Sequence, residues 1–315
     1  MRRRLLVAVT ALSCPAGGAR AQEVRREFAE LHMGVAVRIE LYAPDDAAAR
    51  TAARAAYARI AELEDIMSDY RPASEVRRLA ERPGTAVPVS EPLFAVLVRA
   101  LQLARLSAGA FDPTVGPFVE LWRLARRTGR LPTRAALAAA ARRVGWRKVH
   151  ADSATRTVRL ATPGMRIDLG GIAKGYILDQ ALAELRRHGV TRALIQAGGD
   201  IVAGDAPPGL SGWRVDVGGD GDPALRARAG ALAHAGLGVS GDTEQYVILD
   251  GVRYSHVVDP RTGLGLTSRR QATVVAEDGV TADGLATALT VLDDARGAEL
   301  LRSYPGVVAE VRRAQ

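Results

Sequence analysis

The sequence predicts an α+β fold, in which helices flank a β-sheet core of mixed strand direction. Helical periodicity dominates the first half of the chain, short β-rich runs cluster in the middle, and the last part mixes both. Strands do not alternate regularly with helices, which excludes a repeated βαβ architecture. The chain has 315 residues, of which 48% are hydrophobic, so it can bury a large core and is not intrinsically disordered.

The first half is expected to be mainly helical. Residues 33–42 alternate between polar and apolar side chains, which predicts a strand. Helices are predicted at residues 45–67, 91–107, 117–127 and 133–143. Asp45 and Asp46 favour the start of the first helix, because carboxylates stabilise helix N-termini. Residues 67–75 form a polar loop, and residues 108–116 form a loop rich in glycine and proline.

The second half contains most of the predicted strands. They are expected at residues 147–150, 156–161, 166–169, 192–196, 213–217, 231–235, 245–250, 253–258, 272–277 and 306–311. Helices are predicted at residues 173–188, 281–291 and 294–303. Gly189 stands where a left-handed residue would close the first of these helices.

The basic charge of the chain does not indicate a nucleic-acid-binding protein. The net charge is +8, but lysine occurs only at Lys148 and Lys174, and the other basic residues are arginines in an alanine-rich chain. This pattern is typical of a coding bias against lysine. A single cysteine, Cys14, also excludes a disulfide scaffold and a cysteine-rich zinc module.

Residues 1–21 are predicted to be an export signal, followed by one domain over residues 22–315. Three arginines precede an apolar run, and small residues follow it up to Ala21. The run is too short to cross a bilayer. We therefore expect a periplasmic protein without cysteine. The alternative is a lipid anchor at Cys14, which would be its contact with the membrane, but Ala11 stands where lipoprotein signals usually have leucine.

One glycine motif resembles a dinucleotide-binding fingerprint but lies in the wrong context. The residues run from Gly236 through Gly238 to Gly241. The fingerprint binds pyrophosphate only where a strand leads into a helix. Here a strand leads into a turn and a further strand, so we reject a Rossmann fold.

Two other segments are candidates for binding phosphate and a metal. Asp168-Leu-Gly-Gly-Ile-Ala-Lys-Gly175 ends at the start of a predicted helix, whose free N–H groups favour an anion. Asp283 and Thr287 are four residues apart in a later helix, for which Thr281 is the expected N-cap. Their two oxygens, together with phosphate oxygens and water, would suit Mg²⁺. Taken alone, the first segment is equally consistent with an ordinary turn from strand to helix, and the second favours an ordinary helix-start aspartate that complements the helix dipole.

Further polar groups occur in loops. His256 precedes a Pro/Gly turn and is a candidate general base, because histidine titrates near neutral pH. The loop Gly109-Ala-Phe-Asp-Pro-Thr114 combines an aromatic ring, a carboxylate and a hydroxyl, which would suit a planar ligand. We expect His32, His150, His188 and His234 to be structural.

The order of these motifs resembles that of a known family. The motifs are Met33-Gly34, Met67-Ser-Asp-Tyr70-Arg-Pro-Ala-Ser-Glu75, Gly109-Ala-Phe-Asp-Pro-Thr114, Asp168-Leu-Gly-Gly-Ile-Ala-Lys-Gly175, Gly198-Gly-Asp200, Ser240-Gly-Asp242, His256-Val-Val-Asp-Pro-Arg-Thr-Gly263 and Ala282-Asp-Gly-Leu-Ala-Thr287. Together they resemble the FAD:protein FMN transferases, the ApbE family, over nearly all of the chain after the signal. The resemblance implies the α+β fold of these flavin transferases. Thr243 stands where an aromatic residue is common in the family.

The resemblance implies an Mg²⁺-dependent transferase. It would cleave the pyrophosphate of FAD, attach FMN through a phosphoester to a threonine or serine of an exported or membrane redox protein, and release AMP. It implies metal ligation by Asp283 and Thr287 side chains and by the Gly171 carbonyl, with His256 as the candidate catalytic base. The residues implied to line the FAD site are Met33, Tyr70, Ala110, Phe111, Asp112, Asp168, Lys174 and Val258. The alternatives are an exported FAD carrier without transfer activity, and a pyrophosphatase that releases FMN and AMP.

Overall fold

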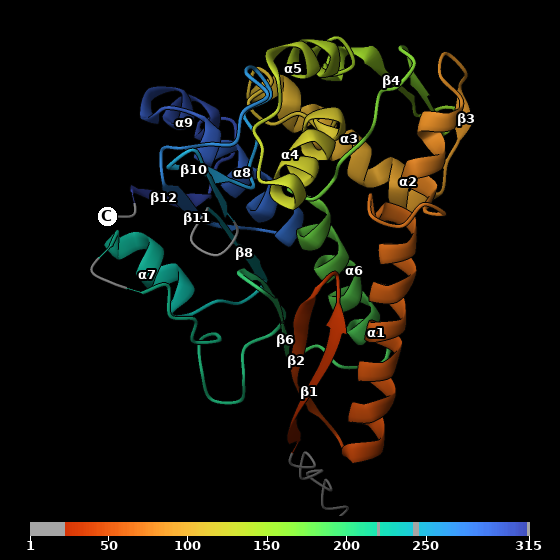
Figure 1. Cartoon of the computed structure of the whole chain (residues 1–315). Helices are drawn as coiled ribbons and strands as arrows, with labels where there is room; N and C mark the ends of the chain where they lie inside the picture. Colours follow the sequence, from red (N-terminus) through yellow and green to blue (C-terminus); the bar gives the residue numbers. More distant parts are fainter. Residues whose placement is uncertain (1–22, 219–220, 242–245, 314–315) are drawn as a thin grey trace, which may run out of the picture.

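A seven-stranded antiparallel sheet forms the centre of the molecule (Figure 1). The computed structural model describes residues 23–218, 221–241 and 246–313. In spatial order the strands are β1 (Val24–His32), β2 (Val35–Ala43), β6 (Ala193–Ala197), β7 (Asp200–Ala203), β8 (Ala235–Ser240), β11 (Arg270–Ala276) and β12 (Val308–Arg313). Each neighbouring pair is antiparallel, whereas a core of mixed strand direction was expected. The predicted α+β class is confirmed.

Helices cover both faces of this sheet. α1 (Asp46–Met67), α6 (Ala173–Arg187) and α8 (Gly279–Val291) pack on one another and on the sheet. Every residue of α8 except Thr287 is buried, so this helix lies in the middle of the main core. On the opposite side, α7 (Pro223–Ala229) packs on β11 and β12 (Figure 1). A second apolar cluster around Trp213 and Leu225 lies there.

The remaining elements lie outside the seven-stranded sheet. The helices among them are α2 (Glu75–Arg78), α3 (Glu91–Leu106), α4 (Gly116–Thr128), α5 (Arg134–Ala141) and α9 (Asp294–Leu301), with single 3-10 turns at Leu79–Glu81 and Trp146–Lys148. A small sheet has the order β3 (Val87–Pro88), β5 (Thr157–Leu160), β4 (Val149–Asp152). A separate hairpin pairs β9 (Tyr246–Leu249) with β10 (Val252–Ser255).

Two of the three helix-capping residues predicted from the sequence are confirmed, and one is wrong. Asp45 is the N-cap of α1 and accepts a hydrogen bond from Ala48 N at 2.8 Å. Gly189 follows α6 with φ of +77°, the left-handed conformation that was expected. The N-cap of α8 is Asp278, whereas Thr281 was predicted. Asp278 Oδ1 accepts from Thr281 N at 2.8 Å.

Three predicted strands were wrong or misplaced. Residues 166–169 join no ladder, although Asp168 N donates to Pro113 O at 2.8 Å. Residues 213–217 contribute only an isolated bridge between Trp213 and Leu232. The strand predicted at 231–235 is β8, which begins at Ala235. The strands β1, β3 and β7 and the helices α2 and α7 were not predicted. Short apolar runs do not by themselves reveal whether a pairing partner is within reach.

The glycines of the rejected dinucleotide motif serve helix packing. A Cβ on Gly238 would lie 2.6 Å from the backbone of Ala282, and one on Gly236 would lie 2.5 Å from that of Gly279. Their absence lets α8 approach β8 closely. Because β8 pairs with β7 and β11 and the next described element is the strand β9, the structure supports rejection of a Rossmann fold.

The predicted export signal and Cys14 lie outside the described residues. Among the residues that the structure does describe, no helix combines the length and the apolar character needed to cross a bilayer.

Candidate functional site

The first turn of α6 meets the middle of α8 at a buried carboxylate. Gly175 N donates to Asp283 Oδ2 at 3.0 Å. Gly175 also lies directly against the backbone of α8, because a Cβ there would be 2.0 Å from Gly279 O. Asp283 is only 5% exposed, and burial together with the nearby charge of Asp200 raises its pKa to about 7. Asp283 thus places a carboxyl group where the N-terminus of α6 meets α8.

Of the three predicted metal ligands, Gly171 and Thr287 lie side by side. A Cβ on Gly171 would be 2.9 Å from Thr287 Oγ1, so the Gly171 backbone touches the threonine side chain. Thr287 lies one helical turn after Asp283, at the one position of α8 that is not fully buried. A carboxylate, a hydroxyl and a backbone carbonyl are hard oxygen donors of the kind that Mg²⁺ prefers. The residues present therefore fit Mg²⁺.

This donor set is incomplete without a ligand. Within the described ranges, no group of three or more histidine, cysteine, aspartate or glutamate side chains could hold a metal ion. Mg²⁺ commonly binds through one or two carboxylates, with the remaining positions taken by water and substrate phosphates.

A second buried acid, Asp200, was missed as a site residue. It is 2% exposed and forms an ion pair with Lys174, and its Oδ1 accepts from Val239 N at 3.3 Å. Burial raises its pKa, whereas Lys174 lowers it. Lys174 was expected among the FAD-lining residues, and the structure places its ammonium on this carboxylate, beside Asp283. The signal available in the sequence was Asp200 directly after Gly198-Gly199, but the strand β7 that buries it was not predicted.

Asp168 and Tyr70 meet through an arginine that the sequence analysis did not select. Arg123 of α4 donates to Asp69 Oδ2 at 2.5 Å and lies 3.9 Å from Asp168 Oδ2. Its guanidinium carbon is 3.8 Å from the centroid of the Tyr70 ring. Burial, with the neighbouring Asp69 charge, raises the pKa of Asp168 to about 6. Two predicted FAD-site residues are thus linked in one cluster.

The predicted aromatic loop is held by its own carboxylate. Asp112 Oδ1 accepts from Thr114 N and Oγ1 at 2.8 and 2.6 Å, and its Oδ2 accepts from Trp146 N at 2.9 Å. Burial is the main reason that its pKa is raised. Ala110 and Phe111 are 3% and 5% exposed and belong to the main core. Asp112 therefore shapes this loop through backbone contacts.

Met33 and Val258 lie in separate parts of the fold. Met33 occupies the turn between β1 and β2 with φ of +52°, and its N–H donates to Glu64 Oε2 at 3.1 Å. Val258 is 7% exposed, packs in the cluster that contains Phe118, and pairs with Gly265 in an isolated bridge.

His256 is an exposed residue directly after β10. The backbone around it is ordered by Val257 N, which donates to Ser255 Oγ at 3.0 Å, and by the turn in which Gly263 N donates to Asp259 O at 2.8 Å. Three of the histidines that were expected to be structural lie beside carboxylates. The pairs are His32 with Glu30 at 3.2 Å, His188 with Glu184 at 3.3 Å and His234 with Asp205 at 3.1 Å.

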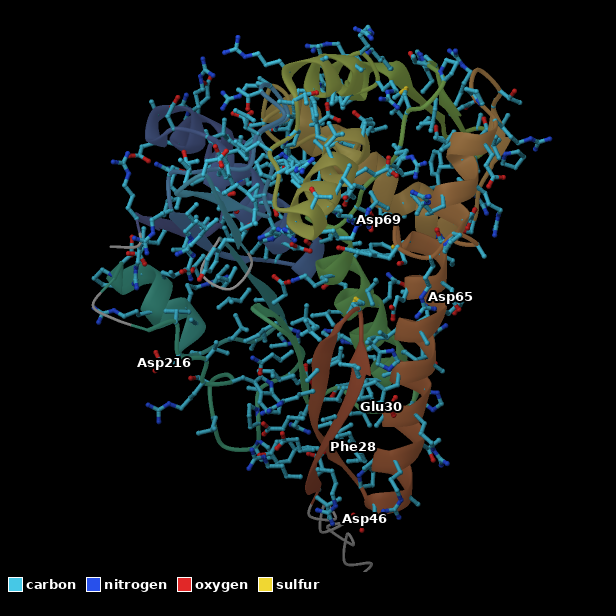
Figure 2. All side chains as sticks on the ribbon, viewed as in Figure 1. Phe28, Glu30, Asp46, Asp65, Asp69 and Asp216 are labelled. Carbon is cyan, nitrogen blue, oxygen red and sulfur yellow. The ribbon has the colours of Figure 1, made fainter. Side chains whose placement is uncertain are left out.

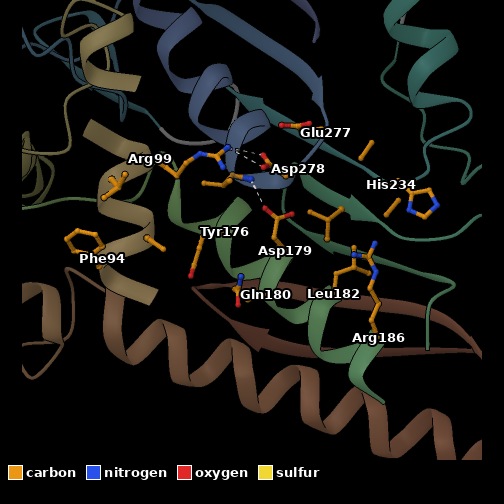
Figure 3. A pocket seen from close by; sticks show the side chains of 16 residues that line it. Phe94, Arg99, Tyr176, Asp179, Gln180, Leu182, Arg186, His234, Glu277 and Asp278 are labelled. Carbon is orange, nitrogen blue, oxygen red and sulfur yellow. Dashed lines mark hydrogen bonds and ion pairs between the residues drawn. The ribbon is translucent and has the colours of Figure 1, made fainter. Parts of the chain in front are cut away.

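A cavity of about 710 Å³ lies away from these groups, between α3, α6 and the start of α8 (Figure 3). None of the predicted site residues lines it. Its polar groups satisfy the N-terminus of α8: Asp179 accepts from Gly279 N and Val280 N at 2.8 and 2.9 Å, and Arg99 donates to Asp278. Asp283 does not line this cavity.

Comparison with protein families gives one match over most of the chain. A model described as the ApbE family matches residues 33–311. A FAD:protein FMN transferase of Treponema pallidum is 35% identical, over 93% of this chain and 85% of that protein. A FAD:protein FMN transferase of Klebsiella pneumoniae is 32% identical, over 90% of this chain and 87% of that protein.

Solved structures of ApbE proteins are also similar to this chain. The ApbE protein of Thermotoga maritima is similar with a TM-score of 0.79 and 30% identity, over 93% of this chain and 97% of that one. The flavin transferase ApbE of Vibrio cholerae has a TM-score of 0.79 and 29% identity, over 91% and 93% of the two chains.

Proposed function

The chain belongs to the ApbE family, and from this premise and its site we propose that it is an Mg²⁺-dependent FAD:protein FMN transferase. In this reaction a hydroxyl oxygen of a protein threonine or serine forms a bond to the FMN phosphorus of FAD. The bond from that phosphorus to the bridging oxygen breaks, and AMP leaves. The hydroxyl proton passes to a base.

The observation that carries this proposal is the meeting of Gly171, Asp283 and Thr287 at the start of α6. Gly171 touches Thr287, and Asp283 accepts from Gly175 N in the first turn of α6. Bound Mg²⁺ would supply charge neutralisation for the pyrophosphate. The helix N-terminus adds N–H groups that favour an anion, and Lys174 compensates the charge of Asp200 beside this centre. Phosphoryl transfer depends mainly on such positioning and electrostatic stabilisation.

His256 is our candidate for the base. Its imidazole is exposed, so an acceptor protein can reach it. A neutral imidazole nitrogen would take the proton of the acceptor hydroxyl. Tyr70, Asp168 and the loop at Ala110 and Phe111 would bind and orient FAD. Met33 and Val258 are proposed to contact FAD at the borders of the site.

The proposed setting is the periplasm, with residues 1–21 as an export signal and an exported or membrane redox protein as acceptor. A supporting feature of the sequence is that the only cysteine, Cys14, lies within this segment. Mass spectrometry of the exported protein would reveal an N-terminus at Gln22. An N-terminus at a lipid-modified Cys14 would contradict this proposal.

A labelling assay tests the activity. The protein without residues 1–21 is mixed with FAD, Mg²⁺ and a candidate redox subunit, and covalent flavin fluorescence is read on a denaturing gel. Labelled acceptor and free AMP are expected. Free FMN without labelled protein would instead identify a pyrophosphatase, and bound FAD without turnover would identify a carrier.

Two variants test the assigned roles. Asp283→Ala should abolish Mg²⁺-dependent labelling, because it removes the sole carboxylate of the predicted metal set. His256→Ala should slow labelling by about 10²–10⁴-fold, the usual contribution of a general base. Asp294→Asn and His188→Ala are controls that change exposed groups elsewhere and should label at the normal rate. Full activity in His256→Ala would exclude His256 as the base.

A further inference from the structure

We propose that Arg123 is a positioning residue for the flavin substrate, and that it acts by holding the Tyr70 ring in a fixed orientation. The inference rests on the proposed function, since it assigns how that site orients its ligand. Arg123 belongs to α4 and lies outside every motif that the sequence analysis selected. Figure 2 shows Asp69, one of its partners, between the end of α1 and α4.

The guanidinium of Arg123 connects three segments that are far apart in the sequence. Its Nη2 donates to Asp69 Oδ2 at 2.5 Å, and the same nitrogen lies 3.9 Å from Asp168 Oδ2. Its central carbon lies 3.8 Å from the centroid of the Tyr70 ring, within the range of a cation–π contact. A planar, delocalised cation can make the ion pairs and the ring contact at once, which a lysine ammonium does less well.

The Tyr70 ring is supported on one face and open on the other. The residue is 74% exposed, although the guanidinium covers part of it. Tyr70 lies in the loop between α1 and α2, where no backbone ladder fixes its orientation. An aromatic ring held in this way can stack on a flat heteroaromatic ring system without first losing conformational freedom, and such preorganisation increases affinity.

The charges of the cluster show why an arginine is needed there. The side chains of Asp69 and Asp168 are 14% and 12% exposed, and Arg123 is 24% exposed. Asp69 and Asp168 are both largely buried, and their negative charges would repel each other without the Arg123 cation between them. Burial opposes the charge of Arg123, but the two carboxylates outweigh that effect and keep its pKa raised. Arg123 therefore stabilises the loop as well as the ring, and the test has to separate the two effects.

The test measures FAD binding by quenching of flavin fluorescence, without Mg²⁺ and without an acceptor. Tyr70→Leu removes the ring at an exposed position, so it should fold normally and bind FAD about tenfold more weakly. Arg123→Met should weaken binding to a similar extent. Arg123→Lys keeps the positive charge but not the planar face, and it should retain thermal stability while binding FAD several-fold more weakly. A purely structural role predicts that lysine restores FAD binding, which would overturn the proposal.

The double variant decides whether Arg123 acts through Tyr70. In the Tyr70→Leu background, Arg123→Met should weaken FAD binding by less than twofold more. A further tenfold loss would overturn the proposal, as would normal binding by both single variants.

In turnover, Arg123→Lys should raise KM for FAD and leave kcat within twofold. Arg126→Met, on an exposed position of the same helix, is the control. Failure of the wild type to bind FAD would overturn the proposed function itself, whereas normal FAD binding in the variants would overturn this inference alone.

Discussion

Asp179 illustrates how a single buried carboxyl makes stability depend on pH. It accepts two hydrogen bonds from the backbone at the start of α8, but burial outweighs them and raises its pKa to about 7. The folded state therefore binds the Asp179 proton more tightly than the unfolded state does. The stabilisation from this group is complete below about pH 4, its unfolded pKa, and is lost as the pH rises towards 7.

Asp179→Asn should remove this pH dependence. The free energy of unfolding of the variant, relative to the wild type, should increase by about 2 kcal/mol between pH 5 and pH 8. Urea unfolding at both pH values measures it. Asp294→Asn is the control, because the pKa of exposed Asp294 is lowered by Arg270 and its charge does not change in this range. A constant difference between Asp179→Asn and the wild type would contradict the assignment.

Helical spacing predicts the proximity only of residues that are close in sequence. Asp283 and Thr287 share one face of a helix, so their spacing predicts their proximity. Asp200 and Arg123 were missed because their partners are brought to them by tertiary packing. Lys174 was selected for its rarity among the basic residues. The structure shows that the other lysine, Lys148, caps the end of α5, where Nζ donates to Arg142 O and Val144 O at 2.7 and 2.9 Å.

At the scale of elements, the crossing of α6 over α8 depends on glycine. A Cβ on Gly175 would lie 2.0 Å from Gly279 O and 2.4 Å from its carbonyl carbon. Backbone atoms cannot move aside as a flexible side chain can, so the helices would have to separate. The same movement would carry Gly175 N away from Asp283.

Gly175→Ala should therefore lower the free energy of unfolding by about 1–3 kcal/mol or more. It should also raise the Mg²⁺ concentration that the reaction needs. Thermal unfolding and Mg²⁺ titration measure the two effects. Gly297→Ala in α9 is the matched control, since its Cβ would meet only the end of the Leu289 side chain at 3.1 Å. It should change stability by less than about 1 kcal/mol. Equal effects of the two substitutions would contradict the packing argument.

Helices were predicted better than strands, for a physical reason. Each main helix carries its own hydrogen bonds and capping signals, such as Asp45 before α1 and Gly189 after α6. A strand needs a partner. Residues 166–169 have the composition of a strand but form no ladder, whereas the charged edge strand β1 pairs with β2 along its whole length.

For the whole molecule, FAD and Mg²⁺ should bind as one unit to the folded state. The predicted ligand-binding residues come from the β1–β2 turn, α6, α8 and several loops, so binding should oppose global unfolding. A ligand at about 100 times its Kd adds about 2.7 kcal/mol of stability. We expect FAD plus Mg²⁺ to raise Tm more than the two separate shifts combined. Asp283→Ala should lose the Mg²⁺ increment and keep most of the FAD increment. An equal Mg²⁺ increment in that variant would contradict metal binding at Asp283.

Half of the net charge of the whole chain comes from the predicted export signal. Four arginines and no acidic residue lie in residues 1–21, so a chain cleaved after Ala21 would carry a net charge of +4. This modest excess gives no reason to expect nucleic-acid binding.

The sequence by itself determined the fold class, the main helices and the family resemblance, because periodicity, capping residues and motif order are local or linear properties. It also predicted that Asp283 and Thr287 share one helix face, since they are four residues apart. Only the tertiary structure brought Gly171 to Thr287, Lys174 to Asp200 and Arg123 to Tyr70. These contacts join residues that are 26 to 116 positions apart, and no local pattern encodes them. They depend on close packing of glycines and on burial of charges that must find a partner.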